Sequence, residues 1–68
     1  MLTIKQKLRL SLERRGARFV RETTGYTIFR CLNHNGYHFL GASGALLYGQ
    51  TIEDARPLSA AAKGLLLK

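Results

Sequence analysis

At 68 residues the chain is long enough for one small domain, residues 1–68, and its single cysteine, Cys31, excludes an internal disulfide. Eleven Lys and Arg against four Asp and Glu give a net charge of +7, which makes a strongly basic protein. No apolar run approaches the roughly eighteen residues of a membrane span and no signal peptide is evident, so we expect a cytoplasmic protein without a membrane partner.

The first expected element is a helix that starts near Thr3 and ends before Gly16. Thr3 and Gln6 have the spacing of a capping box, and Gly16 suits the position just past a helix end, where a left-handed backbone is needed. Apolar residues recur every four positions and therefore lie along one face. These residues are Ile4, Leu8 and Leu12.

From residue 17 the apolar pattern alternates, as it does in strands. The stretch ARFVRE at 17–22 predicts a strand with Ala17 and Phe19 on one face and Arg18, Val20 and Glu22 on the other. After a turn signal at 23–25, YTIFRCL at 26–32 is rich in β-branched and aromatic residues and predicts a central strand.

Three further strand and turn signals follow. Asn35-Gly36 predicts a type I′ hairpin turn, which leads into a returning strand at 37–40. GASG at 41–44 indicates another turn, and ALLYGQ at 45–50 predicts a fourth short strand.

The last third indicates a loop and a short helix. Residues 51–57 predict a loop or a single turn, with Thr51 and Asp54 spaced like a local cap. Ser59 can cap a helix over 60–68, which is too short to be stable unless its leucines dock on the rest of the protein. Its apolar LLLK end predicts a homodimer contact if it does not dock in this way.

Together these elements predict an α+β fold. We expect a small antiparallel sheet of three or four strands, with one face packed by the N-terminal helix and a short C-terminal helix nearby. A one-residue change of register would exchange the buried set for the exposed one. The expected core is Ile4, Leu8, Leu12, Phe19, Ile28 or Phe29, Phe39, Leu46 or Leu47, and Leu65.

Positive charge is concentrated in the first thirty residues. Residues 1–30 hold eight basic and two acidic side chains, a net of +6, whereas residues 31–68 hold three and two, a net of +1. Such asymmetry is typical of proteins that bind polyanions, although a solvated basic surface explains it equally well. The candidate nucleic-acid-binding residues are Lys5, Lys7, Arg9, Arg14, Arg15, Arg18, Arg21 and Arg30.

No catalytic, cofactor or metal-binding motif is present, so we expect a protein that is not an enzyme. His34 and His38 near the hairpin are the only pair suited to general acid-base work, and they leave a ribonuclease as a minor hypothesis. Tyr37 and Phe39 alternate along one strand, which usually indicates half of a core face and less often a surface on which bases stack.

One family resemblance is visible. The order helix, three strands, helix, with LERRGARFVRETTGYTIFR at 12–30, resembles HicA-type messenger-RNA interferase toxins over about Leu8 to Arg30. The resemblance implies a double-stranded-RNA-binding-like fold and RNA binding. That family carries its catalytic histidine just after a glycine in the second strand, where this chain has Gly25 and then Tyr26. The small size and basic composition also resemble phage or prophage accessory proteins.

The sequence therefore predicts a non-catalytic DNA- or RNA-binding module whose basic N-terminal surface contacts phosphates. The alternative is a phage-type accessory protein that binds an acidic host protein, in anti-defence or host takeover, through the same arginines. No cofactor is expected in either case.

Overall fold

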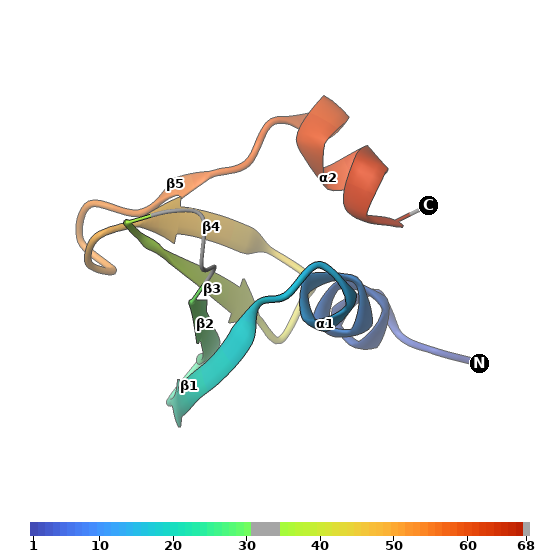
Figure 1. The fold of residues 1–68 in the computed structure, drawn as a ribbon, viewed down its shortest axis with the longest axis horizontal. Helices are drawn as coiled ribbons and strands as arrows, with labels where there is room; N and C mark the ends of the chain where they lie inside the picture. The colour runs from blue at the N-terminus through green and yellow to red at the C-terminus, as the bar shows by residue number, and fades with distance from the viewer. Residues whose placement is uncertain (31–34, 68) are drawn as a thin grey trace.

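A helix, five strands and a second helix follow one another in the computed structural model, which describes residues 1–30 and 35–67 (Figure 1). The elements are α1 (Ile4–Arg14), β1 (Arg18–Thr23), β2 (Tyr26–Arg30), β3 (Tyr37–Gly41), β4 (Leu46–Gly49), β5 (Arg56–Pro57) and α2 (Ala60–Leu67). The strands form one antiparallel sheet in the order β1-β2-β3-β4-β5, so each lies beside its neighbour in sequence. The α+β fold is confirmed, with a two-residue fifth strand where the sequence indicated only a loop or turn.

Helix α1 has the two ends that its sequence predicts. The Gln6 amide donates to Thr3 Oγ1 at 3.1 Å, and the Thr3 amide donates to Gln6 Oε1 at 2.8 Å, which completes the capping box. At the other end Gly16 has a φ of 94°, and the Ala17 amide donates to the Leu12 carbonyl at 2.9 Å. This is a Schellman ending, and it turns the chain directly into β1.

Alternation along the strands divides the sheet into two faces. The helix-side face carries Phe29, Leu40 and Leu46, which form the core with Leu8 and Leu12 of α1. The open face carries the alternate residues of the same strands, which point to the other side of the sheet. It includes Arg18, Arg21, Thr23, Tyr26, Ile28, Arg30, Tyr37, Phe39 and Leu47.

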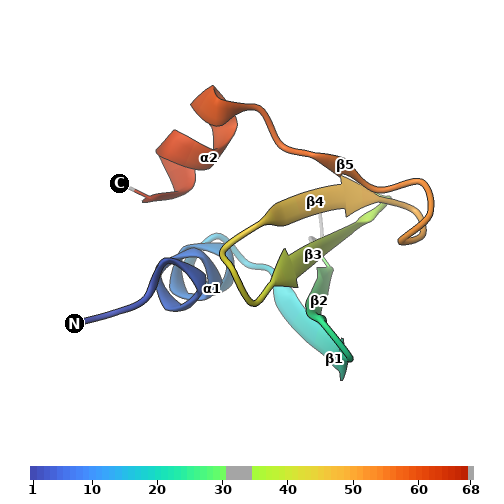
Figure 2. The same ribbon diagram turned by 180° about the vertical axis from the view of Figure 1, so that it is seen from behind.

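Both helices lie at one side of the molecule. In two opposite views, α1 and α2 occupy the side away from the tip of β1 and from the loop between β4 and β5 (Figures 1 and 2). The open face is therefore left without a helical cover.

Three residues that the sequence placed in the core are half exposed. Ile4 lies in the first turn of α1, Phe19 lies on the edge strand β1, and Leu65 faces away from the core on α2, with exposed fractions of 51%, 50% and 58%. Leu66 takes the place expected for Leu65, because it is Leu66 that packs against the core cluster.

Elsewhere the core prediction is confirmed, and the open alternatives are settled. Phe29 lies in the core on the helix-side face, while Ile28 is buried on the opposite face. Leu46 joins the core, whereas Leu47 is half buried opposite Phe39.

A β-bulge overturns the expected alternation of β1. The register shifts between Phe19 and Arg21, so that Arg21 lies opposite Ile28 and Glu22 lies opposite Thr27. Val20 is the extra residue of the bulge, and it has no partner in the register between β1 and β2. Arg21 therefore joins the open face, and Glu22 moves to the helix-side face, the reverse of what a regular strand gives.

The expected type I′ turn at Asn35-Gly36 is wrong. Tyr37 pairs with Arg30, whereas a two-residue turn at 35–36 would pair it with residue 34. Gly36 does not have the positive φ that the second central position of a type I′ turn requires. Cys31 and His34, and the expected end of the strand at 31–32, lie outside the described residues.

The C-terminal segments follow their local signals. Thr51 Oγ1 accepts from the Asp54 amide at 3.3 Å, as the cap-like spacing predicts. Ser59 Oγ accepts from the Ala62 amide at 3.2 Å and caps α2.

In the part of the chain that the structure describes, neither helix is long and apolar enough to cross a membrane.

Candidate binding site

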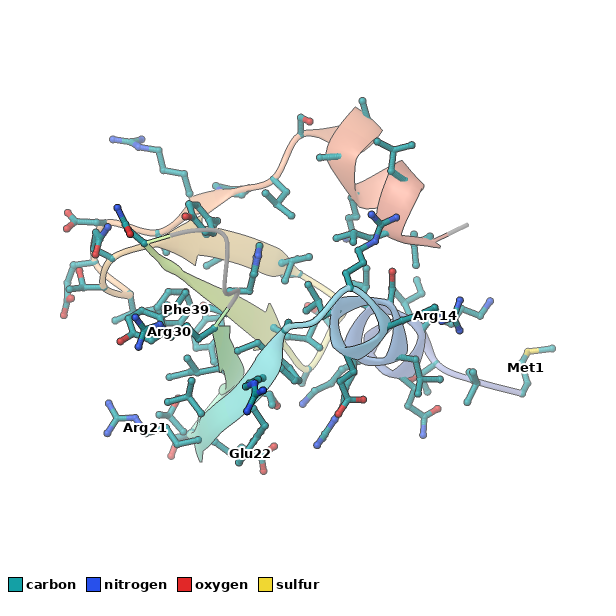
Figure 3. The ribbon with its side chains drawn as sticks, viewed as in Figure 1. Met1, Arg14, Arg21, Glu22, Arg30 and Phe39 are labelled. Carbon is teal, nitrogen blue, oxygen red and sulfur yellow. The ribbon has the colours of Figure 1, made fainter. Side chains whose placement is uncertain are left out.

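The eight candidate basic residues separate into two sets. Five belong to α1 and its C-terminal end, and three belong to β1 and β2 on the open face. Arg14 extends from α1 on one side of the molecule, whereas Arg21 and Arg30 lie on the other (Figure 3). The structure thus brings Arg18, Arg21 and Arg30 together and leaves Lys5, Lys7, Arg9, Arg14 and Arg15 apart from them.

Two arginines of the first set have structural contacts. The Arg9 guanidinium lies 5.7 Å from the ring centres of both Phe19 and Phe29, and its Nε is 3.9 Å from a Glu13 carboxylate oxygen. Such placement over aromatic rings stabilises the fold where Phe19 reaches the surface. Arg15 donates from Nη2 to the Leu65 carbonyl at 3.3 Å, which joins the end of α1 to α2.

The second set, which we call the arginine cluster, consists of Arg18, Arg21 and Arg30. Arg18 and Arg30 are exposed and lie directly opposite each other on neighbouring strands. Like charges in this arrangement repel each other. Among residues 1–30 and 35–67 the only ion pair is the one between Arg9 and Glu13, so no carboxylate neutralises the cluster.

Beside the arginine cluster the open face is hollowed into a groove of about 700 Å³. Ile28 and Phe39 line it and are only 8% and 5% exposed, which makes an apolar floor. Tyr26 and Tyr37, both half buried, lie on the same face, and the Tyr26 ring meets Phe39 edge-on at 6.3 Å. The remaining lining residues are Val20, Arg21, Thr23, Thr24, Gln50, Thr51, Ile52 and Glu53.

The walls of the groove come from two distant parts of the chain. One wall is the outer half of β1 and its turn, residues 20–24, and the other is the loop after β4, residues 50–53. The β-bulge in β1 determines which charged side chain reaches the groove, because it brings Arg21 to the open face. It also turns Glu22 to the helix-side face, where the carboxylate accepts a hydrogen bond from the buried Thr27 hydroxyl at 2.9 Å. Glu53 is therefore the acidic residue that lines the groove.

Of the two histidines of the minor ribonuclease hypothesis, His34 lies outside the described residues and His38 lies away from the groove. His38 is 8% exposed and belongs to the helix-side face, where its ring centre is 5.0 Å from that of Tyr48. It therefore lies on the face opposite the arginine cluster. Within the described ranges no three His, Cys, Asp or Glu side chains gather as metal ligands do.

Sequence reasoning missed Tyr26, Ile28 and the 50–53 loop as parts of the site. The signal for the first two was present, because Tyr26, Ile28 and Arg30 alternate along a single strand. The loop had no such signal, since residues 50–53 are far from β1 in the sequence and only the structure shows that both line the same groove. Tyr37 and Phe39 do share the face that stacking would need.

Comparison with protein-family models, with curated proteins and with solved structures found no match to this chain.

Proposed function

We propose that this protein is a non-catalytic nucleic-acid-binding module that contacts phosphates through the arginine cluster of its open sheet face. The observation that carries the proposal is the pairing of Arg18 with Arg30 across two strands without a carboxylate partner among the described residues. A guanidinium presents a planar fork of N–H donors that matches phosphate oxygens, and two opposed guanidiniums gain most when an anion lies between them.

The sequence alone favoured a wider surface that included α1. The contacts of Arg9 and Arg15 give those two residues a role in holding the fold, so they add little to a phosphate site. Lys5, Lys7 and Arg14 contribute long-range attraction rather than direct contacts. The proposal therefore narrows the contacting residues to Arg18, Arg21 and Arg30.

Binding of fluorescein-labelled oligonucleotides, measured by anisotropy at several salt concentrations, tests the proposal. Each of Arg18→Gln, Arg21→Gln and Arg30→Gln is expected to weaken binding about threefold to tenfold. Each is also expected to reduce the slope of log K against log salt by about 0.7 to 0.9, the value for one lost phosphate contact. The matched controls Lys7→Gln and Arg14→Gln remove the same charge from exposed positions on α1 and should change affinity less than about twofold.

Two results would contradict the proposal. Equal losses in the cluster variants and in the α1 controls would mean that net charge alone drives binding. Affinity that does not change with salt, or no binding at micromolar protein, would mean that phosphates are not the ligand.

The second candidate is an accessory protein of the phage type that binds an acidic protein. The observation that favours it is the exposed edge of the sheet, because all six residues of β1 are exposed and β1 is the first strand in the order of the described sheet. Pull-down from lysate with and without nuclease separates the two candidates. Retention of one acidic protein after nuclease treatment favours the second candidate, and its loss favours nucleic acid.

A further inference from the structure

We infer that the groove beside the arginine cluster holds an unpaired base, so that the ligand is single-stranded nucleic acid rather than a duplex. The inference rests on the proposed function and adds to it the strandedness of the ligand. It draws on a different part of the site, the apolar floor and the two tyrosines, which phosphate binding alone does not require.

The register orders these groups in three parallel rows across the open face. Arg18, Arg30 and Tyr37 form the first row, since Arg30 pairs with both of the others. The second row is Arg21, Ile28, Phe39 and Leu47, and the third is Thr23 and Tyr26. The apolar floor of the second row thus lies between a tyrosine on each side, with arginines at the β1 end of two rows.

This arrangement suits a nucleotide whose base is turned out. A base is flat and largely apolar on its two faces, and the bottom of the groove, lined by Ile28 and Phe39, is also apolar. The half-buried Tyr26 and Tyr37 rings supply aromatic surface at the sides. Arg30 lies directly opposite Tyr37, so a phosphate attached to the same nucleotide can reach the cluster.

A duplex cannot use the groove in this way. Its bases are stacked inside, and it presents phosphates and base edges, so the apolar floor would gain no contact from it. Single strands bind proteins through a positively charged surface joined to aromatic side chains, and each stacked base raises affinity roughly tenfold. Charge complementarity at the arginine cluster identifies the occupant as anionic, and the adjacent apolar floor favours the unpaired form.

The lining also holds polar groups that can orient a base. Gln50 lies in the wall opposite β1, and Glu53 adds an acceptor in the same wall. A carboxylate repels phosphate but accepts a hydrogen bond from an exocyclic amine. Phosphates are therefore expected at the β1 side of the groove and the base edge at the 50–53 side.

Three probes of equal length test the inference with the wild-type protein: a single-stranded oligonucleotide, the same backbone without bases, and a duplex. The single strand is expected to bind about tenfold more tightly than either of the others at the same salt concentration. The protein has three tyrosines and no tryptophan, so its intrinsic emission reports on tyrosine. Tyrosine emission should fall when the single strand binds and stay unchanged with the abasic strand.

Variants of the two groove tyrosines then locate the base. Tyr26→Leu and Tyr37→Leu are expected to lower single-strand affinity about threefold to tenfold and to leave duplex affinity unchanged, because only the ring is lost. Tyr26→Phe keeps the ring and should retain the affinity. The melting temperature of each variant shows whether it is folded, and the wild-type comparison of the three probes does not depend on any variant.

The outcomes of these experiments distinguish a failure of this inference from a failure of the proposed function, which is phosphate binding by the arginine cluster. If the single, abasic and duplex probes bind equally and still need Arg18 and Arg30, the base-holding groove is wrong while phosphate binding stands. If none of the probes binds, the proposed function itself is wrong. Tighter binding of the duplex than of the single strand would also overturn the inference.

Discussion

Residues of one type have different roles in this protein according to where the backbone places them. Arg9 lies over two aromatic rings, Arg15 donates to a carbonyl of α2, and Arg18 lies opposite another arginine. The first two contribute to folding, and only the last is left to attract an anion. A count of basic residues therefore overstates the binding surface.

Gly49 shows how a single residue shapes the groove. A Cβ at this position would lie 2.7 Å from Ala55 Cα and 2.9 Å from the Ala55 amide nitrogen, which are backbone atoms. The missing side chain therefore lets the 50–55 segment return closely against β4. The 50–53 wall of the groove depends on this approach.

We predict that Gly49→Ala lowers the free energy of unfolding by about 1 to 3 kcal/mol, because the backbone of Ala55 must move. The same substitution at Gly64, where no atom lies within 4 Å of a new Cβ, should raise it by about 0.5 to 1 kcal/mol through better helix propensity. Urea unfolding followed by circular dichroism measures both. A Gly49→Ala protein as stable as the wild type would show that the approach of the two segments is not tight.

At the scale of elements, α2 is held by few contacts. None of its residues is fully buried, and its attachment comes from Leu66 against the core and from the Arg15 side chain at its C-terminal end. An eight-residue helix is not stable alone, so docking must supply most of its stability.

We predict that Leu66→Ala destabilises the protein by about 1 to 2 kcal/mol, less than the cost at a fully buried leucine. The adjacent Leu65→Ala removes the same atoms from a side chain that is 58% exposed and should change stability by less than about 0.5 kcal/mol. Thermal unfolding of the two variants gives the comparison. Equal effects would mean that α2 does not dock through the face that bears Leu66.

Elements with local signals could be predicted, and elements set by pairing could not. The start of α1 depends on the side chains of Thr3 and Gln6, which are three residues apart, and its end depends on the backbone of Gly16. Both signals are local, so the sequence indicated the two ends correctly. Strand β5 consists of Arg56 and Pro57 alone and exists because β4 pairs with it. No pattern of two residues can show that.

The site was partly visible in the sequence for the same reason. Arg18 and Arg30 were singled out by charge, but their direct pairing depends on the bulge between Phe19 and Arg21 as well as on the turn between β1 and β2. The shift at Val20 had no signal, because ARFVRE reads equally well as a regular strand. The assignment of Arg21 and Glu22 to faces therefore required the structure.

At the scale of the whole molecule, a charge of +7 is spread over a chain of 68 residues. The described residues contain one ion pair, between Arg9 and Glu13, with its atoms 3.9 Å apart. Repulsion among the other cations opposes folding in a protein of this size, whose buried surface is small.

We predict opposite effects of salt on stability and on binding. The melting temperature of the free protein should rise between about 20 and 200 mM sodium chloride, because screening reduces the internal repulsion. Oligonucleotide affinity should fall over the same range, because the entropy gained by releasing counterions decreases as the salt concentration rises. Scanning calorimetry and anisotropy in matched buffers measure the two. A melting temperature that falls with salt would show that attractive pairs dominate the folded state.

The bulge at Val20 also bears on how this surface changes in evolution. If Phe19 stayed opposite Phe29, a regular strand of the same six residues would set Glu22 beside Tyr26 and turn Arg21 inward beside Thr27, so the groove edge would be acidic. The sign of the charge there depends on strand length as much as on residue type. A change of register in β1 is thus able to reverse the charge at this edge of the groove without any substitution.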